Sequence, residues 1–342
     1  RGKQQQRGSA CISWVHSQRS QRILPADHRT LSDQGTNNTP FCNDTKLPEI
    51  MKYAITHKTG YNYSEPASLS QNELFLHPRA TSQQLVLQSS LSILPEPQYQ
   101  HRRKDFFGNT VDVFMVQHPH NELVVSATSI VQTSSQAIPE PVNTAPWEEV
   151  STRLASYSHQ TDFEAFPFLF ASPLITVSPQ IASYAMTSFS PGKPLLAGAL
   201  DLMQRIYNEF SYDKTASTID TTVDQVLENK KGVCQDFAHL AISCLRSLGL
   251  SARYVSGYLE TIPTPGKPKL IGSDASHAWV SIFIPDYGWI DFDPTNNLIV
   301  KESHITLAWG RDYGDVAPVK GVVMGGGRHR LTVNVDVAAQ NL

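Results

Sequence analysis

The sequence is poor in cysteine, and its few cysteines are scattered. They stand at positions 11, 42, 234 and 244 of the 342 residues, and no two of them form a Cys-x-x-Cys pair. Disulfide-stapled domains and structural zinc sites both depend on closely and regularly spaced cysteines. The spacing therefore argues against either framework.

Charge and long apolar runs are scarce as well. Charged residues make up 17% of the chain, hydrophobic residues 40%, and the formal net charge is −3, as in an ordinary globular protein. Such a charge predicts no general attraction to nucleic acid or to an anionic membrane surface. No apolar run approaches the roughly 20 residues that span a bilayer. We therefore expect a cytoplasmic protein whose partners include neither nucleic acid nor membrane.

Two ligand-binding motifs are absent too. Gly325, Gly326 and Gly327 lack the following Lys and Ser/Thr of a phosphate-binding loop, so we expect a flexible turn there. No aspartate-rich segment has the spacing of a calcium loop. The sequence accordingly predicts no cofactor and no metal site.

The first fifty residues differ in composition from the rest. Residues 1–50 are rich in Gln, Ser, Arg, Asn and Thr, and such a segment cannot bury enough surface to order itself. Its one apolar stretch, residues 10–15, is too short and too polar for a secretory signal. An alternating pattern begins at Met51. We expect residues 1–50 to be a disordered or artefactual tail and the natural chain to start at Met51.

The remainder is long enough for two domains. Residues 51–135 alternate between apolar and polar positions, which predicts an all-β domain. Residues 136–192 form a proline-punctuated linker and helical connection, and residues 193–315 form an α+β core. Residues 316–342 end in a strand that we expect to extend a sheet. Apolar residues at helical spacing predict helices over residues 147–157, 179–187, 194–210 and 223–229.

Cys234 stands where the sequence turns helical. From this residue onward the apolar positions follow the three-and-four spacing of one buried helical face: Phe237, Leu240, Ala241, Cys244, Leu245 and Leu248. Gly232 breaks the chain just before the helix, and Gly249 ends it. A thiol in the first turn lies beside unpaired backbone N–H groups and the positive end of the helix dipole, which favour its anionic form. The same N–H groups could stabilise an oxyanion on a substrate carbonyl.

A histidine and an aspartate follow in a predicted β-hairpin. Residues 278–284 and 289–292 are rich in residue types that favour strands, and residues 285–288 are typical of a turn. A four-residue loop would place His277 and Asp293 on opposite faces, whereas a three- or five-residue loop, or one bulge, would place them on the same face. The sequence leaves the register open. A thiol at a helix start followed by a histidine and an aspartate is the set of groups that nucleophilic acyl transfer uses.

Four blocks in residues 206–311 resemble the transglutaminase-like cysteine-enzyme superfamily in its bacterial and archaeal protease-type form. In chain order they read GVCQDFAH (232–239), ARYVSGY (252–258), SHAWV (276–280) and GWIDFDPTN (288–296). Residues 51–135 resemble the β-rich N-terminal domain that accompanies many of these proteins. The resemblance implies an α+β, papain-like core, with the nucleophile helix packed on an antiparallel sheet and preceded by a small all-β domain.

The resemblance also implies a role for three residues. Cys234 corresponds to the nucleophile, His277 to the general base and acid, and Asp293 to the residue that orients the histidine. Asp291 is the rival carboxylate. Asp293 is preferred because it occupies the Asp-Pro-Thr position of the family's motif.

The neighbouring side chains have simpler explanations. Cys244 lies on the apolar helix face and is expected to be a small core residue. His239 lies about 140° around the helix axis from Cys234, which favours a packed or hydrogen-bonded histidine. Tyr212 and Trp279 are candidate substrate-binding residues, although packing explains both equally well.

The sequence therefore predicts a cysteine-dependent acyl-transfer enzyme that acts on a peptide or protein. The Cys234 thiolate would attack an amide carbonyl, and His277 would protonate the leaving amine. Since no calcium loop is present, hydrolysis by a peptidase or amidase is favoured over crosslinking by a protein-glutamine gamma-glutamyltransferase. A non-catalytic binding module on the same fold is the alternative from another class.

Overall fold

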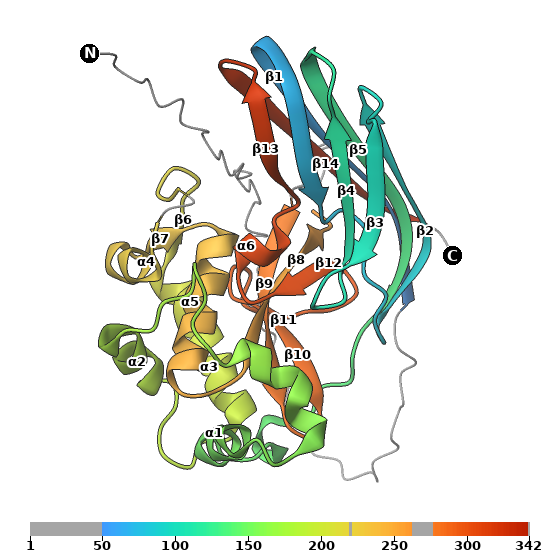
Figure 1. The fold of residues 1–342 in the computed structure, drawn as a ribbon. Coiled ribbons are helices and arrows are strands. Elements are labelled where there is room, and N and C mark those ends of the chain that lie inside the picture. The colour runs from blue at the N-terminus through green and yellow to red at the C-terminus, as the bar shows by residue number, and fades with distance from the viewer. Residues whose placement is uncertain (1–49, 219–220, 262–275, 341–342) are drawn as a thin grey trace, which may run out of the picture.

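The structure of the protein is a computed structural model, and it describes residues 50–218, 221–261 and 276–340. Figure 1 shows a sheet of long strands set above a second, smaller sheet, with the helices gathered beside and beneath the latter. The expectation for a tail over residues 1–49 concerns residues outside the described part. Within that part, no helix is both long enough and apolar enough to cross a membrane.

The larger sheet contains seven antiparallel strands. Its order is β2-β5-β1-β4-β3, and β13 and β14 also pair with β1. Two strands from the end of the chain thus complete a sheet built by its beginning, and the strand expected to extend a sheet is confirmed as β14. The bounds are β1 Ile50–Leu74, β2 Gln84–Leu94, β3 Tyr99–Lys104, β4 Thr110–Val116, β5 His120–Ser134, β13 Val319–Gly325 and β14 His329–Gln340.

The helices agree with the predicted spacing. The four predicted helices are confirmed as α1 Trp147–Ser156, α2 Pro179–Met186, α3 Leu195–Glu209 and α4 Val223–Asn229. Helix α5, Cys234–Ser247, is buried along all but its last residue. The remaining helices of the described residues are two 3₁₀ helices, η1 Pro141–Asn143 and η2 Gln160–Phe168, and the short α6 Tyr313–Val316.

The smaller sheet carries the hairpin. Its antiparallel order is β11-β10-β9-β8-β12, and α5 packs against β8 and β9. The bounds are β8 Ala252–Leu259, β9 Ser276–Ile284, β10 Gly288–Asp293, β11 Leu298–Ile299 and β12 His304–Gly310. A helix buried on a sheet, with a separate β sheet attached, confirms the predicted α+β class.

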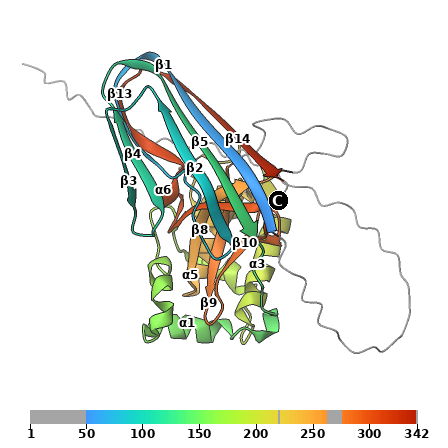
Figure 2. The same ribbon diagram turned by 90° about the vertical axis from the view of Figure 1, so that its right-hand side faces the viewer.

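The smaller sheet lies beneath the long strands of the larger one in Figure 2, and side chains from β2 and from the turn between β3 and β4 bind its edge. Gln84 donates to the carbonyl of Thr306 at 2.7 Å and accepts from its N–H at 2.8 Å. Asn109 makes the same pair of bonds to Trp309, at 2.8 and 3.1 Å. Because β12 is an edge strand, these amides satisfy backbone groups that no neighbouring strand can reach.

Candidate active site

Helix α5 begins at the predicted thiol. Cys234 is its first residue, and Val233 is the N-cap. Asp236 folds back to accept the Val233 N–H at 2.7 Å and the Ser217 hydroxyl at 2.6 Å, which fixes the first turn. A Cβ at position 232 would lie 2.7–2.8 Å from Asp236 atoms, so Gly232 leaves the room that this turn needs. The prediction that Cys234 lies in the first turn is confirmed.

The hairpin adopts the register that joins the histidine to the aspartate. Gly288 pairs with Ile284, so the loop has three residues, Pro285 to Tyr287. Asp286 and Gly288 both take positive φ, 71° and 80°, in this tight connection. With an odd-numbered loop, side chains at 277 and 293 fall on the same face of the sheet.

Three side chains then form one hydrogen-bonded chain. His277 Nε2 lies 2.7 Å from Asp293 Oδ2, and the Cys234 thiol is a hydrogen-bond partner of the same histidine. Because Nε2 is engaged by Asp293, Nδ1 is the nitrogen left for the thiol. All three residues are fully buried. The structure thus brings together the three residues that the sequence singled out.

The opposite charges of His277 and Asp293 stabilise each other. Burial alone lowers the pKa of His277, but the charge of Asp293 and hydrogen bonds to Asp293 and Cys234 outweigh it and raise the pKa to about 10. Burial raises the pKa of Asp293, but the charge and hydrogen bonds of His277, with those of His304, hold it well below its ordinary value. The pair is therefore an imidazolium facing a carboxylate at neutral pH.

Asp293 is held by more groups than its position before a proline predicted. Its Oδ2 atom also accepts from Asn296 Nδ2 at 2.7 Å and from His304 Nε2 at 3.2 Å. Its Oδ1 atom accepts the backbone N–H groups of Thr295 and Asn296, at 2.9 and 3.3 Å. A carboxylate with this many donors stays ionised and keeps one orientation.

His304 joins this cluster, and the sequence alone did not single it out. It starts β12, is buried, and makes a T-shaped ring contact with Trp279 at 5.2 Å. The ligand atoms of His277, Asp293 and His304 lie within 4.8 Å of one another, a spacing at which three groups can hold a metal ion. Here both histidines bind the same carboxylate oxygen, which satisfies the set by hydrogen bonding. No local motif marks His304, because its contact with Asp293 depends on tertiary packing.

The rival carboxylate has a different partner. Asp291 Oδ2 accepts the indole N–H of Trp279 at 2.8 Å. It pairs in register with Ser281, two positions along β10 from Asp293. Asp291 therefore fixes the wall beside the histidine, whereas Asp293 binds the histidine itself.

The two candidate substrate-binding residues lie around the site but do not take part in the Cys234–His277–Asp293 hydrogen bonds. Tyr212 is half-buried in β6, Ser211–Tyr212, beside Gly232 of β7, Lys231–Gly232, so it lies near the helix start. Trp279 is fully buried, with its ring 6.1 Å from that of His277. Their role in substrate binding stays a prediction.

The two dismissed residues on α5 are structural. His239 accepts the Tyr313 N–H at 3.2 Å, which confirms a hydrogen-bonded histidine. Cys244 is fully buried, which confirms a small core residue, and burial raises the pKa of its thiol to about 12.

Comparisons with known proteins agree with this geometry. Residues 53–132 match the family model described as the bacterial transglutaminase-like N-terminal region, and residues 183–294 match that of the transglutaminase-like superfamily. A solved structure from Cytophaga hutchinsonii, described as a candidate cysteine protease, superposes with a TM-score of 0.69. It is 23% identical, with 86% of this chain and 92% of that chain covered, and so shows the shared fold.

Relatives of almost full length extend the match. An uncharacterized protein of Mycobacterium tuberculosis is 38% identical over 296 residues, covering 84% of this chain and 92% of the relative. One from Mycobacterium leprae is 32% identical over 291 residues, covering 84% and 99%. A protein-glutamine gamma-glutamyltransferase of Pseudomonas aeruginosa is 34% identical over 98 residues, covering 28% and 15%. The chain belongs to the transglutaminase-like superfamily and carries its bacterial N-terminal region ahead of the core.

Proposed function

We propose that this protein is a cysteine-dependent acyl-transfer enzyme that hydrolyses peptide or amide bonds. The observation that carries the proposal is the buried hydrogen-bonded chain from Cys234 through His277 to Asp293, with its thiol at a helix start. A thiolate beside an imidazolium is a strong nucleophile with a proton donor already in place.

The reaction proceeds in two halves. The Cys234 sulfur attacks the amide carbonyl, the carbonyl oxygen gains the negative charge, and the first-turn N–H groups of α5 stabilise it. The C–N bond then breaks, His277 gives its proton to the leaving amine, and a thioester remains on Cys234. In the second half His277 takes a proton from water, and the water oxygen forms a bond to the thioester carbon. The C–S bond then breaks, which releases the acid and returns Cys234 as a thiolate beside the imidazolium. Asp293 orients His277 in both halves.

Transfer to an amine is the second candidate, because it shares the same thioester. The specific observation in its favour is the match of about a hundred residues to the Pseudomonas gamma-glutamyltransferase. In that case an amine, rather than water, resolves the thioester. The two outcomes differ only in the group that reaches the acylated sulfur.

A peptide-library reaction followed by mass spectrometry tests the proposal. Wild-type protein is incubated with glutamine-rich and mixed peptides, with and without hydroxylamine or a lysine amine. Hydrolysis yields carboxylic acids, whereas transfer yields hydroxamates or crosslinked amides. Cys234→Ala is expected to lose every product, because it removes the attacking sulfur.

Cys244→Ala serves as the matched control, since Cys244 lies on the same helix but is inert. It is expected to retain product formation. Turnover that survives in Cys234→Ala would contradict the assignment. Product loss in both variants alike would give the assignment no support, because a shared loss reports damage to the helix rather than to the nucleophile.

A further inference from the structure

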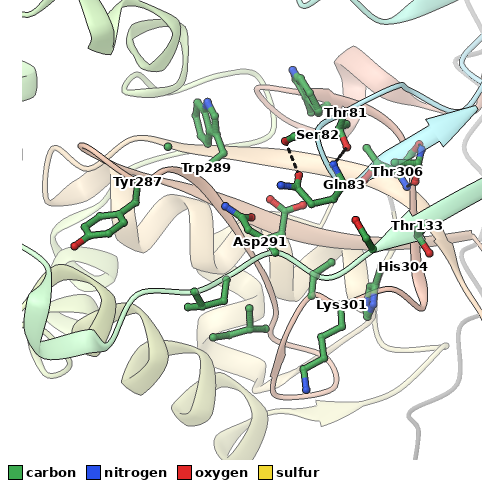
Figure 3. Close-up of a pocket in the computed structure, with 18 of the residues that line it drawn as sticks. Thr81, Ser82, Gln83, Thr133, Tyr287, Trp289, Asp291, Lys301, His304 and Thr306 are labelled. Carbon is green, nitrogen blue, oxygen red and sulfur yellow. Dashed lines mark hydrogen bonds between the residues drawn. The ribbon is translucent and has the colours of Figure 1, made fainter. Parts of the chain in front are cut away.

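A cavity of about 360 Å³ lies between the two sheets, apart from the thiol. Figure 3 shows side chains from both parts of the molecule lining it, among them Gln83 and Thr133 from the larger sheet's side and Trp289 and Asp291 from the smaller sheet. Cys234, His277 and Asp293 do not line it. Its volume is in the range of small-molecule sites.

Arg253 of β8 lines this cavity between two tryptophan rings. Its guanidinium carbon lies 4.0 Å from the centre of the Trp289 ring and 3.7 Å from that of Trp309. Arg79 stacks on Trp309 as well, at 3.5 Å. Stacking covers the two faces of the Arg253 guanidinium, so its N–H donors are left to bind acceptors in its own plane.

One of these donors has no acceptor among the described residues. Arg253 is 7% exposed, and its Nε atom is buried without a hydrogen-bond partner. The indole N–H of Trp289 and the hydroxyl of Ser281 are buried without partners too. A buried polar group left unpaired costs about 1–3 kcal/mol. Arg253 and Trp289 both line the cavity, so a molecule bound there can supply the partners that their nitrogens lack.

The charges along the cavity select the kind of molecule. Arg253 and Lys301 are its lining cations at neutral pH, and Glu164 and Asp291 are its lining carboxylates. Arg253 and Asp291 lie on one row of the sheet, each paired in register with Ser281 between them. A dianion such as phosphate would meet two carboxylates there, whereas a molecule with one carboxylate and one ammonium group matches both signs.

We propose that this cavity binds a zwitterion of amino-acid type. The ligand carboxylate accepts from the in-plane donors of Arg253, in the forked geometry that guanidinium and carboxylate share. The ligand ammonium faces Asp291. His304 also lines the cavity and binds Asp293, so the ligand lies one side chain away from the catalytic chain.

Binding to the wild-type full-length protein is the direct test. Titration calorimetry is run with L-alanine, with acetate as a carboxylate alone, with ethylamine as an ammonium alone, and with inorganic phosphate. L-alanine is expected to bind at least about tenfold more tightly than the other three. Absence of L-alanine binding at tens of millimolar, or tighter binding of phosphate, would overturn the proposal.

Two variants locate the bound molecule. Arg253→Lys keeps the charge but loses the fork, and is expected to weaken L-alanine about tenfold or more. Asp291→Asn is expected to weaken L-alanine but not acetate. Unchanged L-alanine binding in Arg253→Lys would place the ligand elsewhere.

A spectroscopic readout covers the case in which Arg253→Lys does not fold. In the wild-type protein the indole N–H resonance of Trp289 is expected to shift on addition of L-alanine. That of Trp147, which donates to the Ser190 carbonyl at 3.1 Å outside the cavity, is the internal control. A Trp289 resonance that moves no more than the Trp147 resonance would overturn the proposal. Cys234→Ala is expected to bind L-alanine normally, so the outcome is separable from that of the proposed acyl transfer.

Discussion

Two nearby aspartates in β10, Asp291 and Asp293, bind different partners, which indicates different roles for them. Asp293 binds His277 and His304, whereas Asp291 binds the indole of Trp279. Under the proposed mechanism only Asp293 acts on the proton-carrying histidine. The two residues therefore offer a matched pair for mutation.

Asp293→Asn is expected to lower kcat/KM by about two to four orders of magnitude, because a neutral amide does not stabilise the imidazolium as a carboxylate does. Asp291→Asn is expected to lower it by less than about tenfold. Steady-state kinetics on a peptide found in the library reaction compares them. An equal loss in both variants would contradict the assignment of Asp293 as the orienting residue.

His304 is expected to act as a positioning residue. His304→Ala removes one donor from the Asp293 carboxylate, and we expect a fall in kcat of about tenfold with KM little changed. His304→Gln keeps an N–H donor and should restore part of the loss. If His304 had a purely structural role, neither variant would change the pH dependence of kcat. The proposed role predicts that the pH values at which kcat rises and falls are shifted in His304→Ala.

The His277–Asp293 pair also predicts how stability depends on pH. The pKa of His277 is raised from 6.5 to about 10 in the folded protein, so between these values the folded state holds a proton that the unfolded state has lost. The stabilisation is complete below pH 6.5 and is lost as pH rises toward 10, by at most about 1.4 kcal/mol per pH unit. Urea unfolding of wild-type and Asp293→Asn protein measures it. The difference in their free energies of unfolding should shrink over this window, and a constant difference would contradict the pairing.

At the scale of elements, the hairpin shows where sequence reasoning ended. The residue types of β9 and β10 and the turn between them were predictable, because strand propensity and turn chemistry are local. The register was not, because a change of one residue in the loop reverses which face Asp293 occupies. The structure resolves this with a three-residue loop and positive φ at Asp286 and Gly288.

The packing of β8 against its neighbours requires a glycine at position 257. It pairs with His277 in the sheet, and a Cβ there would collide with the Ile305 carbonyl and the Trp279 ring. Gly257→Ala is expected to lower the free energy of unfolding by about 2 kcal/mol or more in urea denaturation. Gly192→Ala is the control, since Gly192 has positive φ but no atom within 4 Å of the point where a Cβ would lie; it should cost about 1 kcal/mol. Equal costs would contradict a packing requirement at Gly257.

At the scale of the whole molecule, the order of the elements along the chain was largely predictable, but the contacts between distant elements were not. Hydrophobic periodicity predicted the helices and the N-terminal strands. Strands β13 and β14 return to pair with β1, and the side-chain amides of Gln84 and Asn109 form hydrogen bonds to β12. These contacts join residues about 200 or more positions apart. The same long-range packing brings His304 to Asp293 and closes the cavity around Arg253. These contacts have no local signature, since they arise only when both sheets are in place.

The central claim is that His277 activates the Cys234 thiol. The most direct measurement is the rate at which iodoacetamide alkylates Cys234 in the native full-length protein below pH 7, read peptide by peptide in wild-type and His277→Asn proteins, with Cys244 as the internal reference. The account predicts that Cys234 reacts faster than Cys244 in the wild-type protein, and that this advantage is lost in His277→Asn. Equal Cys234 rates in the two proteins would contradict it.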